Sequence, residues 1–334
     1  MTKEKLIRRI FLTGGAGFIG SHVAEALLRQ GALLTLVDNV DNFYSVAQKR
    51  SNLREIKKAG DYELVEIDIC DSEALDAAVQ LAQPDCIVHL AARAGVRPSI
   101  EQPALYERVN VAGTLNLLEA ARKFHVTKFV FGSSSSVYGE SGNIPFSEAE
   151  AQMRPISPYA ATKLAGELMC YTYAHLHGIA AVCLRFFTVF GPRQRPDLAI
   201  HKFTALIEGG RPIPVFGDGS SGRDYTYVGD IAAGILAAVD YQSSARPPFE
   251  IVNLGNSHPV KLSELIEQLE IATGKKALRD PQPMQPGDVP ITWADIGKAQ
   301  RLLGYQPRTT LAQGLQNFVA WYRATNLVNQ GDSR

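Results

Sequence analysis

A tyrosine and a lysine four residues apart are the first pair in this chain that could perform acid–base chemistry. Tyr159 and Lys163 lie in the segment SPYAATKLAGELM, in which Pro158 suits the first turn of a helix. Their spacing places both side chains on one helix face. A nearby ammonium group favours a phenolate and lowers the tyrosine pKa from about 10, which gives a general base for an alcohol. On an ordinary helix the same spacing is commonly a surface pair, so the pair needs a site around it.

Four consecutive serines could form part of that site. They stand in FGSSSSVYG, residues 131–139, directly after the apolar run KFVF. Serine bonds readily to its own backbone, so a solvated turn is one interpretation. The alternative is that KFVFGSS is a strand of a parallel sheet, because ligands bind at the carboxyl ends of such strands.

A glycine-rich turn predicts a dinucleotide cofactor. In LTGGAGFIGSH, Gly15, Gly17 and Gly20 match G-x-G-x-x-G, and Gly14 begins an overlapping G-x-x-G-x-x-G. Such glycines let the backbone approach a pyrophosphate that faces the N-terminus of the following helix, expected here over 18–30. A glycine-rich turn that binds nothing is the alternative.

Acidic residues after the next two strands extend this prediction. Asp38 ends LLTLVD, where a carboxylate binds the adenosine ribose and repels a ribose phosphate, so NAD is favoured over NADP. Asp68 ends YELVEID and could accept a hydrogen bond from the adenine amino group. A helix N-cap is a nearly equal interpretation for Asp68 or Asp71.

The elements that must position these residues alternate between strands and helices, which predicts an α/β Rossmann fold with a doubly wound parallel sheet. Seven strands are expected, at 10–14, 33–38, 62–68, 86–92, 128–134, 181–187 and 250–255. After Phe187 the chain is rich in Gly and Pro, with helices near 198–209, 261–273 and 312–325. We expect an NAD-binding domain over 1–187, to which 230–255 returns, and a smaller substrate-binding lobe mainly over 188–334.

Composition excludes several function classes. The 34 basic and 34 acidic residues balance, which argues against nucleic acid or an anionic membrane as a partner. No apolar run approaches the roughly 20 residues that a membrane helix needs, and the N-terminal residues lead into a strand, so we expect a cytoplasmic protein. The four cysteines and seven histidines show no metal-ligand spacing, so no metal is expected.

Taken together, these segments resemble the extended short-chain dehydrogenase/reductase family, and within it the nucleotide-sugar epimerases and dehydratases. The resemblance covers nearly the whole chain and rests on TGGAGFIG, HLAARAGVR, YERVNVAGT, SSSSVYG, SPYAATK, LRFFTVFGP, GDGSSGRDYTYVGD and MQPGDVPITWAD. It implies that Tyr159 is the base, that Lys163 holds the nicotinamide ribose and that Ser134 shares the hydrogen bonds of the reacting hydroxyl. Asn110 would be a structural or relay position. The NAD contacts implied are Gly14, Gly17, Phe18, Ile19, Gly20, Asp38, Asn39, Asp68, Ile69, Leu90, Ala91, Ala92, Tyr159 and Lys163.

The serine run distinguishes between the reactions of this family. Its 4,6-dehydratases carry acids between the catalytic hydroxyl and V-Y-G, and relatives that decarboxylate carry a Glu there. Ser135 and Ser136 occupy those places here. The resemblance therefore implies a 4-epimerase that retains its NAD through turnover. The alternative from another class is a non-catalytic NAD-binding regulator, which would have no need of the intact Tyr159 and Lys163.

The sugar is indicated by smaller differences. LRFFTVFGPRQRPDLA and MQPGDVPITWAD resemble UDP-glucuronate 4-epimerases most, and Thr188 and Gln285 replace the Asn and Arg usual in UDP-glucose 4-epimerases, which are the enzymatic alternative. Phe190 and Arg193 stand where these enzymes often have Tyr and Trp. The predicted substrate contacts are Ser135, Ser136, Thr188, Arg195, Arg223 and Asp288, with hydroxyls for a C6 carboxylate and arginines for the diphosphate. A homodimer through helices over 103–124 and 157–177 is also expected.

Overall fold

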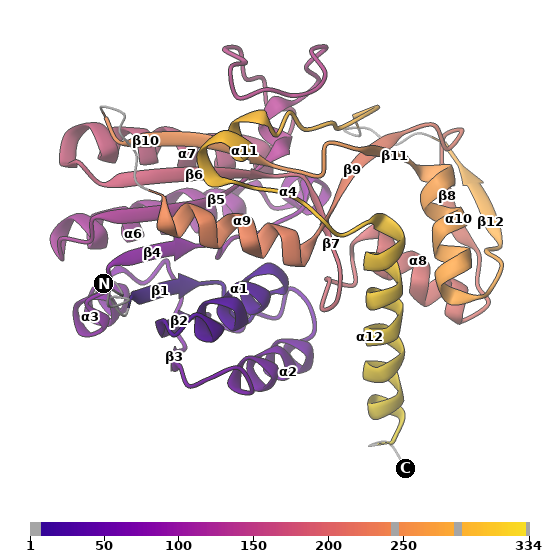
Figure 1. Ribbon diagram of the computed structural model, residues 1–334, viewed down its shortest axis with the longest axis horizontal. Helices are drawn as coiled ribbons and strands as arrows, with labels where there is room; N and C mark the ends of the chain where they lie inside the picture. Colours follow the sequence, from indigo (N-terminus) through magenta and orange to yellow (C-terminus); the bar gives the residue numbers. More distant parts are fainter. Residues whose placement is uncertain (1–7, 242–246, 284–288, 332–334) are drawn as a thin grey trace, which may run out of the picture.

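A seven-stranded parallel sheet forms the centre of the computed structural model, which describes residues 8–241, 247–283 and 289–331, and side chains as far as 325 (Figure 1). All six neighbouring strand pairs are parallel. Their order is β10-β6-β5-β4-β1-β2-β3. The strands are β1 (Arg9–Thr13), β2 (Leu33–Val37), β3 (Glu63–Val65), β4 (Cys86–His89), β5 (Lys128–Ser134), β6 (Ala180–Phe186) and β10 (Phe249–Leu254). The seven predicted strands and the predicted fold class are confirmed.

Helices cover both faces of this sheet, which is why most of the buried side chains of its central strands are apolar on both faces. One hydrophobic core holds residues of α1 (Phe18–Arg29), α2 (Val46–Lys57) and α9 (Val228–Asp240). The core on the opposite face holds residues of α3 (Ser72–Ala82), α6 (Gly113–Lys123) and α7 (Pro158–His177). Figure 1 shows the two layers on either side of the strands.

Helix α7 begins and ends at clear capping residues, and Pro158 lies in its first turn as the sequence predicts. Ser157 caps the helix by accepting a hydrogen bond from the Ala160 N–H at 3.2 Å, Pro158 occupies its first turn, and Gly178 ends it with a φ of 70°. These signals fix where the helix starts, and therefore where the side chain of Tyr159 lies against the edge of the sheet.

A second group of elements lies beside the sheet and has its own core, formed by residues such as Phe190, Leu265 and Phe318 (Figure 1). It contains a three-stranded sheet of β11 (Pro259–Lys261), β9 (Gly222–Tyr227) and β7 (Thr188–Phe190), and a pair of β12 (Arg279–Gln282) and β8 (Ile213–Phe216). Its helices are α8 (Ala199–Glu208), α10 (Leu262–Thr273) and α12 (Leu311–Gly331). Shorter helical segments elsewhere are α4 (Val96–Glu101), α5 (Pro103–Glu107), η1 (Arg108–Ala112), η2 (Ser135–Tyr138) and α11 (Gly297–Leu303).

The order of the strands determines where a ligand can bind. The chain starts at β1 in the middle of the sheet, moves outward through β2 and β3, and then returns to β4 on the other side of β1. Crevices in such sheets open at the carboxyl ends of the strands where this reversal occurs. β10 pairs with β6, so residues 249–254 do lie in the main sheet. The division into two domains stays a prediction. Among the described residues, no helix is long and apolar enough to span a bilayer.

Candidate active site

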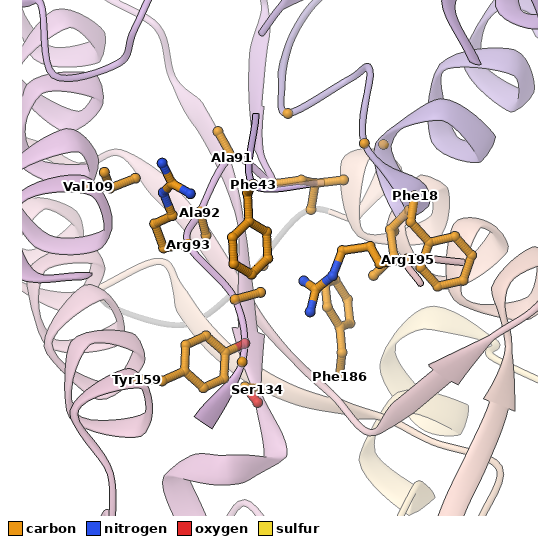
Figure 2. Close-up of a pocket in the computed structure, with 18 of the residues that line it drawn as sticks. Phe18, Phe43, Ala91, Ala92, Arg93, Val109, Ser134, Tyr159, Phe186 and Arg195 are labelled. Carbon is orange, nitrogen blue, oxygen red and sulfur yellow. The ribbon is translucent and has the colours of Figure 1, made fainter. Parts of the chain in front are cut away.

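A cavity of about 520 Å³ lies along the carboxyl edge of the main sheet (Figure 2). It is lined by residues from the ends of β1, β2, β4 and β5, from α7 and from the loops after β6 and β7. All but two of the residues predicted to contact NAD or substrate line it: Gly14, Gly17, Phe18, Ile19, Gly20, Asp38, Asn39, Asp68, Ile69, Leu90, Ala91, Ala92, Ser134, Ser135, Ser136, Tyr159, Lys163, Thr188 and Arg195.

The glycine-rich turn packs so tightly that side chains have no room. Gly14 has a φ of 74°, and a Cβ atom placed there would lie 2.6 Å from the Ala91 nitrogen. A Cβ atom on Gly20 would lie 2.1 Å from the Gly14 carbonyl oxygen. Gly17 is the N-cap of α1 and offers no capping side chain, so the first N–H groups of that helix can bind a ligand. This turn fits the pyrophosphate of a dinucleotide.

Asp38 lies beside this turn and is held by two backbone N–H groups. Its carboxylate accepts hydrogen bonds from Ala16 at 3.1 Å and from Val40 at 2.8 Å. Burial raises the pKa of Asp38, and the positive charge of Lys49 opposes that rise. The carboxylate lines the cavity beside the glycine-rich turn, and its binding of a ribose stays a prediction.

Lys49 and Tyr44 line the same end of the cavity, and sequence reasoning missed both. The Lys49 ammonium lies 4.9 Å from the centre of the Tyr44 ring, and its side chain is buried. The Tyr44 hydroxyl is buried, and no hydrogen-bond partner for it occurs in the part of the chain that the structure describes. An unpaired buried hydroxyl beside a phosphate-binding turn fits a site whose ligand supplies the missing partner. Their position soon after the end of β2 was the available signal.

Asp71 is the helix N-cap, and Asp68 lies in the cavity, where it could accept a hydrogen bond from adenine. Asp71 caps α3 by accepting a hydrogen bond from the Ala74 N–H at 3.1 Å. Asp68 instead lines the cavity and accepts hydrogen bonds from the Cys70 N–H at 2.9 Å and from the Asn39 amide at 3.1 Å. Burial by itself would raise the pKa of Asp68, but these hydrogen bonds hold that pKa below its usual value. Asp68 is thus available as an ionised acceptor next to the cofactor turn.

Tyr159 and Ser134 face each other at the centre of the cavity (Figure 2). Burial raises the pKa of Tyr159, while the hydrogen bond with Ser134 and the charge of Arg195 lower it. Lys163 is buried one turn further along α7, and its ammonium donates a hydrogen bond to the Gly132 carbonyl at 2.7 Å. Burial lowers the Lys163 pKa to about 8. The predicted tuning of Tyr159 by Lys163 stays a prediction.

The serine run is both a turn and part of the cavity wall. The Ser134 hydroxyl caps η2 by accepting a hydrogen bond from the Ser136 N–H at 3.2 Å. It also donates a hydrogen bond to the Ser136 hydroxyl at 3.1 Å. Ser135 and Ser136 also line the cavity. The strand interpretation holds for Ser133 and Ser134, which end β5 and are buried, whereas Ser135 and Ser136 form a half-buried turn whose hydroxyl groups contribute to the cavity wall.

Asn110 lies in a π-helical turn and connects two parts of the site. Its side chain bonds to the backbone of Arg93 in both directions, at 2.8 and 3.0 Å, and donates to the Thr162 hydroxyl at 3.0 Å. These bonds tie the loop after β4 to α7. The geometry is that of a structural position, one of the two roles that the resemblance implies.

Two arginines flank an aromatic ring over the cavity. The guanidinium carbons of Arg93 and Arg195 lie 5.4 and 5.3 Å from the centre of the Phe43 ring, which Figure 2 shows between them. Arg93 pairs with Asp41 at 2.6 Å, and Arg195 pairs with Asp197 at 2.7 Å. Sequence reasoning missed Phe43 and Arg93, although Phe43 lies in the loop after β2 and Arg93 in the loop after β4.

Of the two remaining predicted substrate residues, only Arg223 lies in the part of the chain that the structure describes. Arg223 is half-buried on β9, and its guanidinium donates a hydrogen bond to the Gly222 carbonyl at 2.9 Å. It is not among the cavity-lining residues. Asp288, like Gln285, lies outside the described residues. Substrate contacts by Arg223 and Asp288 stay predictions.

Comparison with known proteins places this architecture in a family. The family model described as GDP-mannose 4,6 dehydratase matches residues 11–318. The chain belongs to this family. A relative named UDP-glucuronate 4-epimerase, from Thermodesulfobacterium geofontis, is 44% identical to this family member over 313 residues, which are 93% of this chain and 94% of the relative.

Two solved structures of other epimerases are similar to the chain. One is the UDP-glucuronic acid 4-epimerase of Bacillus cereus in complex with UDP-glucuronic acid and NAD, with a TM-score of 0.87 and 35% identity over 95% of this chain and 99% of that one. The other is the UDP-glucose 4-epimerase of Thermotoga maritima with UDP-glucose, with a TM-score of 0.86 and 33% identity over the same shares of the two chains. The family resemblance stated from the sequence is confirmed.

Proposed function

We propose that this family member is an NAD-dependent 4-epimerase of a UDP-sugar, and that it interconverts UDP-glucuronate and UDP-galacturonate. One observation carries the choice of reaction: Tyr159 and Ser134 meet beside a dinucleotide turn, while serines at 135 and 136 occupy the places of the dehydratase acids. The named relative from Thermodesulfobacterium geofontis and the Bacillus cereus structure support the choice of substrate.

The residues around Tyr159 assign the proton transfers. In its ionised form Tyr159 takes the proton from the sugar O4 as the C4–O4 bond becomes a carbonyl, and Ser134 holds that oxygen by a hydrogen bond. NAD, held by the glycine-rich turn, Asp38 and Lys163, would supply a hydride acceptor for C4 and a hydride donor for the other face of the 4-keto sugar. Tyr159 then returns its proton to O4. The reaction begins and ends with the same oxidation states, so it needs no further reductant.

The hydroxyl-lined wall is proposed to receive the C6 carboxylate of the sugar. Ser135, Ser136 and Thr188 line the cavity next to Tyr159, and hydroxyls can bind a carboxylate without a full counter-charge. Arg195 is proposed to bind the diphosphate, since a guanidinium suits bidentate anions. The similarity to the Thermotoga maritima enzyme keeps UDP-glucose as the alternative substrate.

A homodimer is proposed through α6 and α7. Large apolar side chains are exposed on these two helices, namely Leu115, Leu168, Tyr171 and Leu176. Exposed apolar surface of this kind is typical of an interface between subunits. The cytoplasmic location remains a prediction.

The reaction is tested by incubating the purified protein with UDP-glucuronate in deuterated buffer and following the sugar signals by proton NMR. We expect UDP-galacturonate without deuterium at carbon, because the hydride returns internally. The variant Tyr159→Phe should lose about 10²–10⁴-fold in rate, as expected for loss of a general base, while retaining NAD. A deoxy-keto product that contains deuterium would show a dehydratase, and conversion of UDP-glucose alone would show the alternative epimerase.

The substrate is tested by the substitution Ser136→Ala. If the hydroxyl binds the carboxylate, kcat/KM should fall more for UDP-glucuronate than for UDP-glucose. Equal losses for both sugars would contradict the carboxylate role.

A further inference from the structure

A buried ion pair joins the helix behind the dinucleotide turn to the loop that carries Arg195. The Arg193 guanidinium pairs with the carboxylate of Glu25 on α1, 168 residues earlier in the chain. Only 12% of the Arg193 side chain and 10% of the Glu25 side chain are exposed. Arg29, which is exposed, also bonds to the Glu25 carboxylate at 3.1 Å. The buried pair with Arg193 fixes the distance between its two elements, because loss of Glu25 leaves the Arg193 charge buried without its counter-charge.

The backbone of Arg193 indicates that the loop is held in a set conformation. Its φ is 66°, in the left-handed region that residues other than glycine rarely adopt. Such a conformation persists only where surrounding contacts determine it.

Two further bonds attach the same loop to the cofactor-binding side. The His22 ring nitrogen is 3.0 Å from the Pro192 carbonyl, and the Gln48 amide donates a hydrogen bond to the Arg193 carbonyl at 3.0 Å. Burial lowers the His22 pKa to about 4, so this ring is neutral at physiological pH. His22 on α1 and Gln48 on α2 therefore contact the backbone carbonyl groups of Pro192 and Arg193, which lie three and two residues before Arg195.

Helix α1 has two functions along its length in this arrangement. Its first turn, with Phe18, faces the cavity at the dinucleotide turn, and its next two turns carry His22 and Glu25 to the loop. Arg195 extends from that loop toward Tyr159 and Phe43 (Figure 2). The position of Arg195 over the cavity thus depends on contacts that lie outside the cavity.

We propose that Glu25 and Arg193 are positioning residues for Arg195, and that their ion pair sets the affinity for the diphosphate of the UDP-sugar. The inference rests on the proposed function, because it takes a UDP-sugar as the ligand of Arg195. Without the pair, the 191–198 loop relaxes and Arg195 no longer meets the anion in a fixed position, whereas Tyr159 and Ser134 keep theirs on α7 and β5. Binding is then weakened, while the chemical step, measured above the Tyr159 pKa where the base is already ionised, is not.

The test measures the affinity of the NAD-loaded protein for UDP and for UDP-glucuronate by calorimetry, together with kcat and KM. The variants Arg193→Met and Glu25→Gln are each made alone and together with Arg195→Ala. We expect each single variant to weaken UDP binding about tenfold and to raise KM, with kcat changed less than about twofold. Combined with Arg195→Ala, the same substitutions should weaken binding by less than about twofold further, because residues that act through one another are not additive.

Controls separate positioning from general damage. Arg50→Met breaks an exposed ion pair with Glu66 on the same side of the molecule and should leave UDP affinity unchanged. If Arg193→Met does not fold, Glu25→Gln keeps the shape of the side chain, and Gln48→Met removes only one bond to the loop. Unchanged affinity in folded variants, or an equal loss with and without Arg195, overturns the inference. A wild-type protein that binds neither UDP nor UDP-glucuronate overturns the proposed function itself.

Discussion

Burial and two neighbouring groups determine how readily Tyr159 can act as a base. Burial raises its pKa, which opposes ionisation, while the hydrogen bond with Ser134 and the charge of Arg195 favour the phenolate. Arg195 comes from a loop on the other side of the cavity from α7, so its charge acts on Tyr159 from a different element than the one that carries Lys163. We therefore expect this arginine to affect both binding and the pH range of activity.

The pH dependence follows from the sign of these effects. Tyr159 must lose its proton, so kcat/KM should rise with pH through the Tyr159 pKa of the free enzyme. Arg195→Met removes a positive charge that lowers this pKa. The pKa then increases, and the acid limb of the kcat/KM profile should move up by about one pH unit. Arg54→Met, at an exposed position on α2, should leave the limb in place. An unmoved limb in Arg195→Met would show that the charge does not act on the base.

The glycine-rich turn that leads into α1 keeps its shape only if Gly20 carries no side chain. A Cβ atom at Gly20 would meet the Gly14 carbonyl oxygen at 2.1 Å, so Gly20→Ala must open the turn that faces the pyrophosphate. We expect bound NAD to fall at least about tenfold, since the backbone N–H groups that would hold the phosphates are displaced. The measurement is the NAD content of the purified protein and a titration with added NAD. Gly142→Ala, with no atom within 4 Å of the new Cβ, is the matched control.

A second buried ion pair joins α7, which carries Tyr159, to β6, the strand that pairs with the strand of Ser134. Arg185 on β6 bonds to Glu167 on α7 at 2.9 and 2.7 Å, and Ser133, next to the catalytic serine, donates to the same carboxylate at 2.5 Å. Both charged side chains are only 2% exposed. The carboxylate thus connects β5, β6 and α7 directly below the cavity.

Removal of this charge should destabilise the fold strongly. We expect Glu167→Gln to lower the free energy of unfolding by about 3–5 kcal/mol, because Arg185 is left buried without its counter-charge. Glu66→Gln, which breaks the exposed pair with Arg50, should cost about 1 kcal/mol or less. Urea unfolding of the NAD-bound protein gives both values. Similar losses for the two variants would contradict the structural importance of the buried pair.

On the scale of the whole molecule, the exposed apolar face of α6 and α7 is the feature that a single subunit leaves unexplained. Leu168 is 61% exposed near the middle of α7, far from the cavity-facing residues at its start. If α6 and α7 form the dimer interface, a charge there is costly only in the assembled protein.

Leu168→Glu should therefore convert the proposed dimer into a monomer. Light scattering after size-exclusion chromatography measures the mass of the wild type and the variant. Leu81→Glu, at a side chain that is 75% exposed on α3, is expected to leave the mass unchanged. A wild-type protein with the mass of a single chain would reject the dimer.

The sequence by itself determined the features that depend on local spacing. The seven strands, the glycine turn and the shared face of Tyr159 and Lys163 were predictable because apolar runs, glycines and a helical period of 3.6 residues are read within short windows. Strand ends were less well predicted. The strand expected over 62–68 is only Glu63–Val65, since an edge strand pairs with one neighbour, and the strand expected to end at 92 ends at His89, where the chain leaves the sheet to line the cavity.

Only the tertiary structure decided which distant residues meet. Lys49 lies beside Asp38, Arg195 approaches Tyr159, and Arg193 pairs with Glu25 from the far half of the chain. No local pattern specifies these contacts, because they depend on the order of the strands and on how loops return across the edge of the sheet. The residues that carry the chemistry of the site could therefore be predicted from short motifs, while the positions of the charged side chains around them are known only from the tertiary structure.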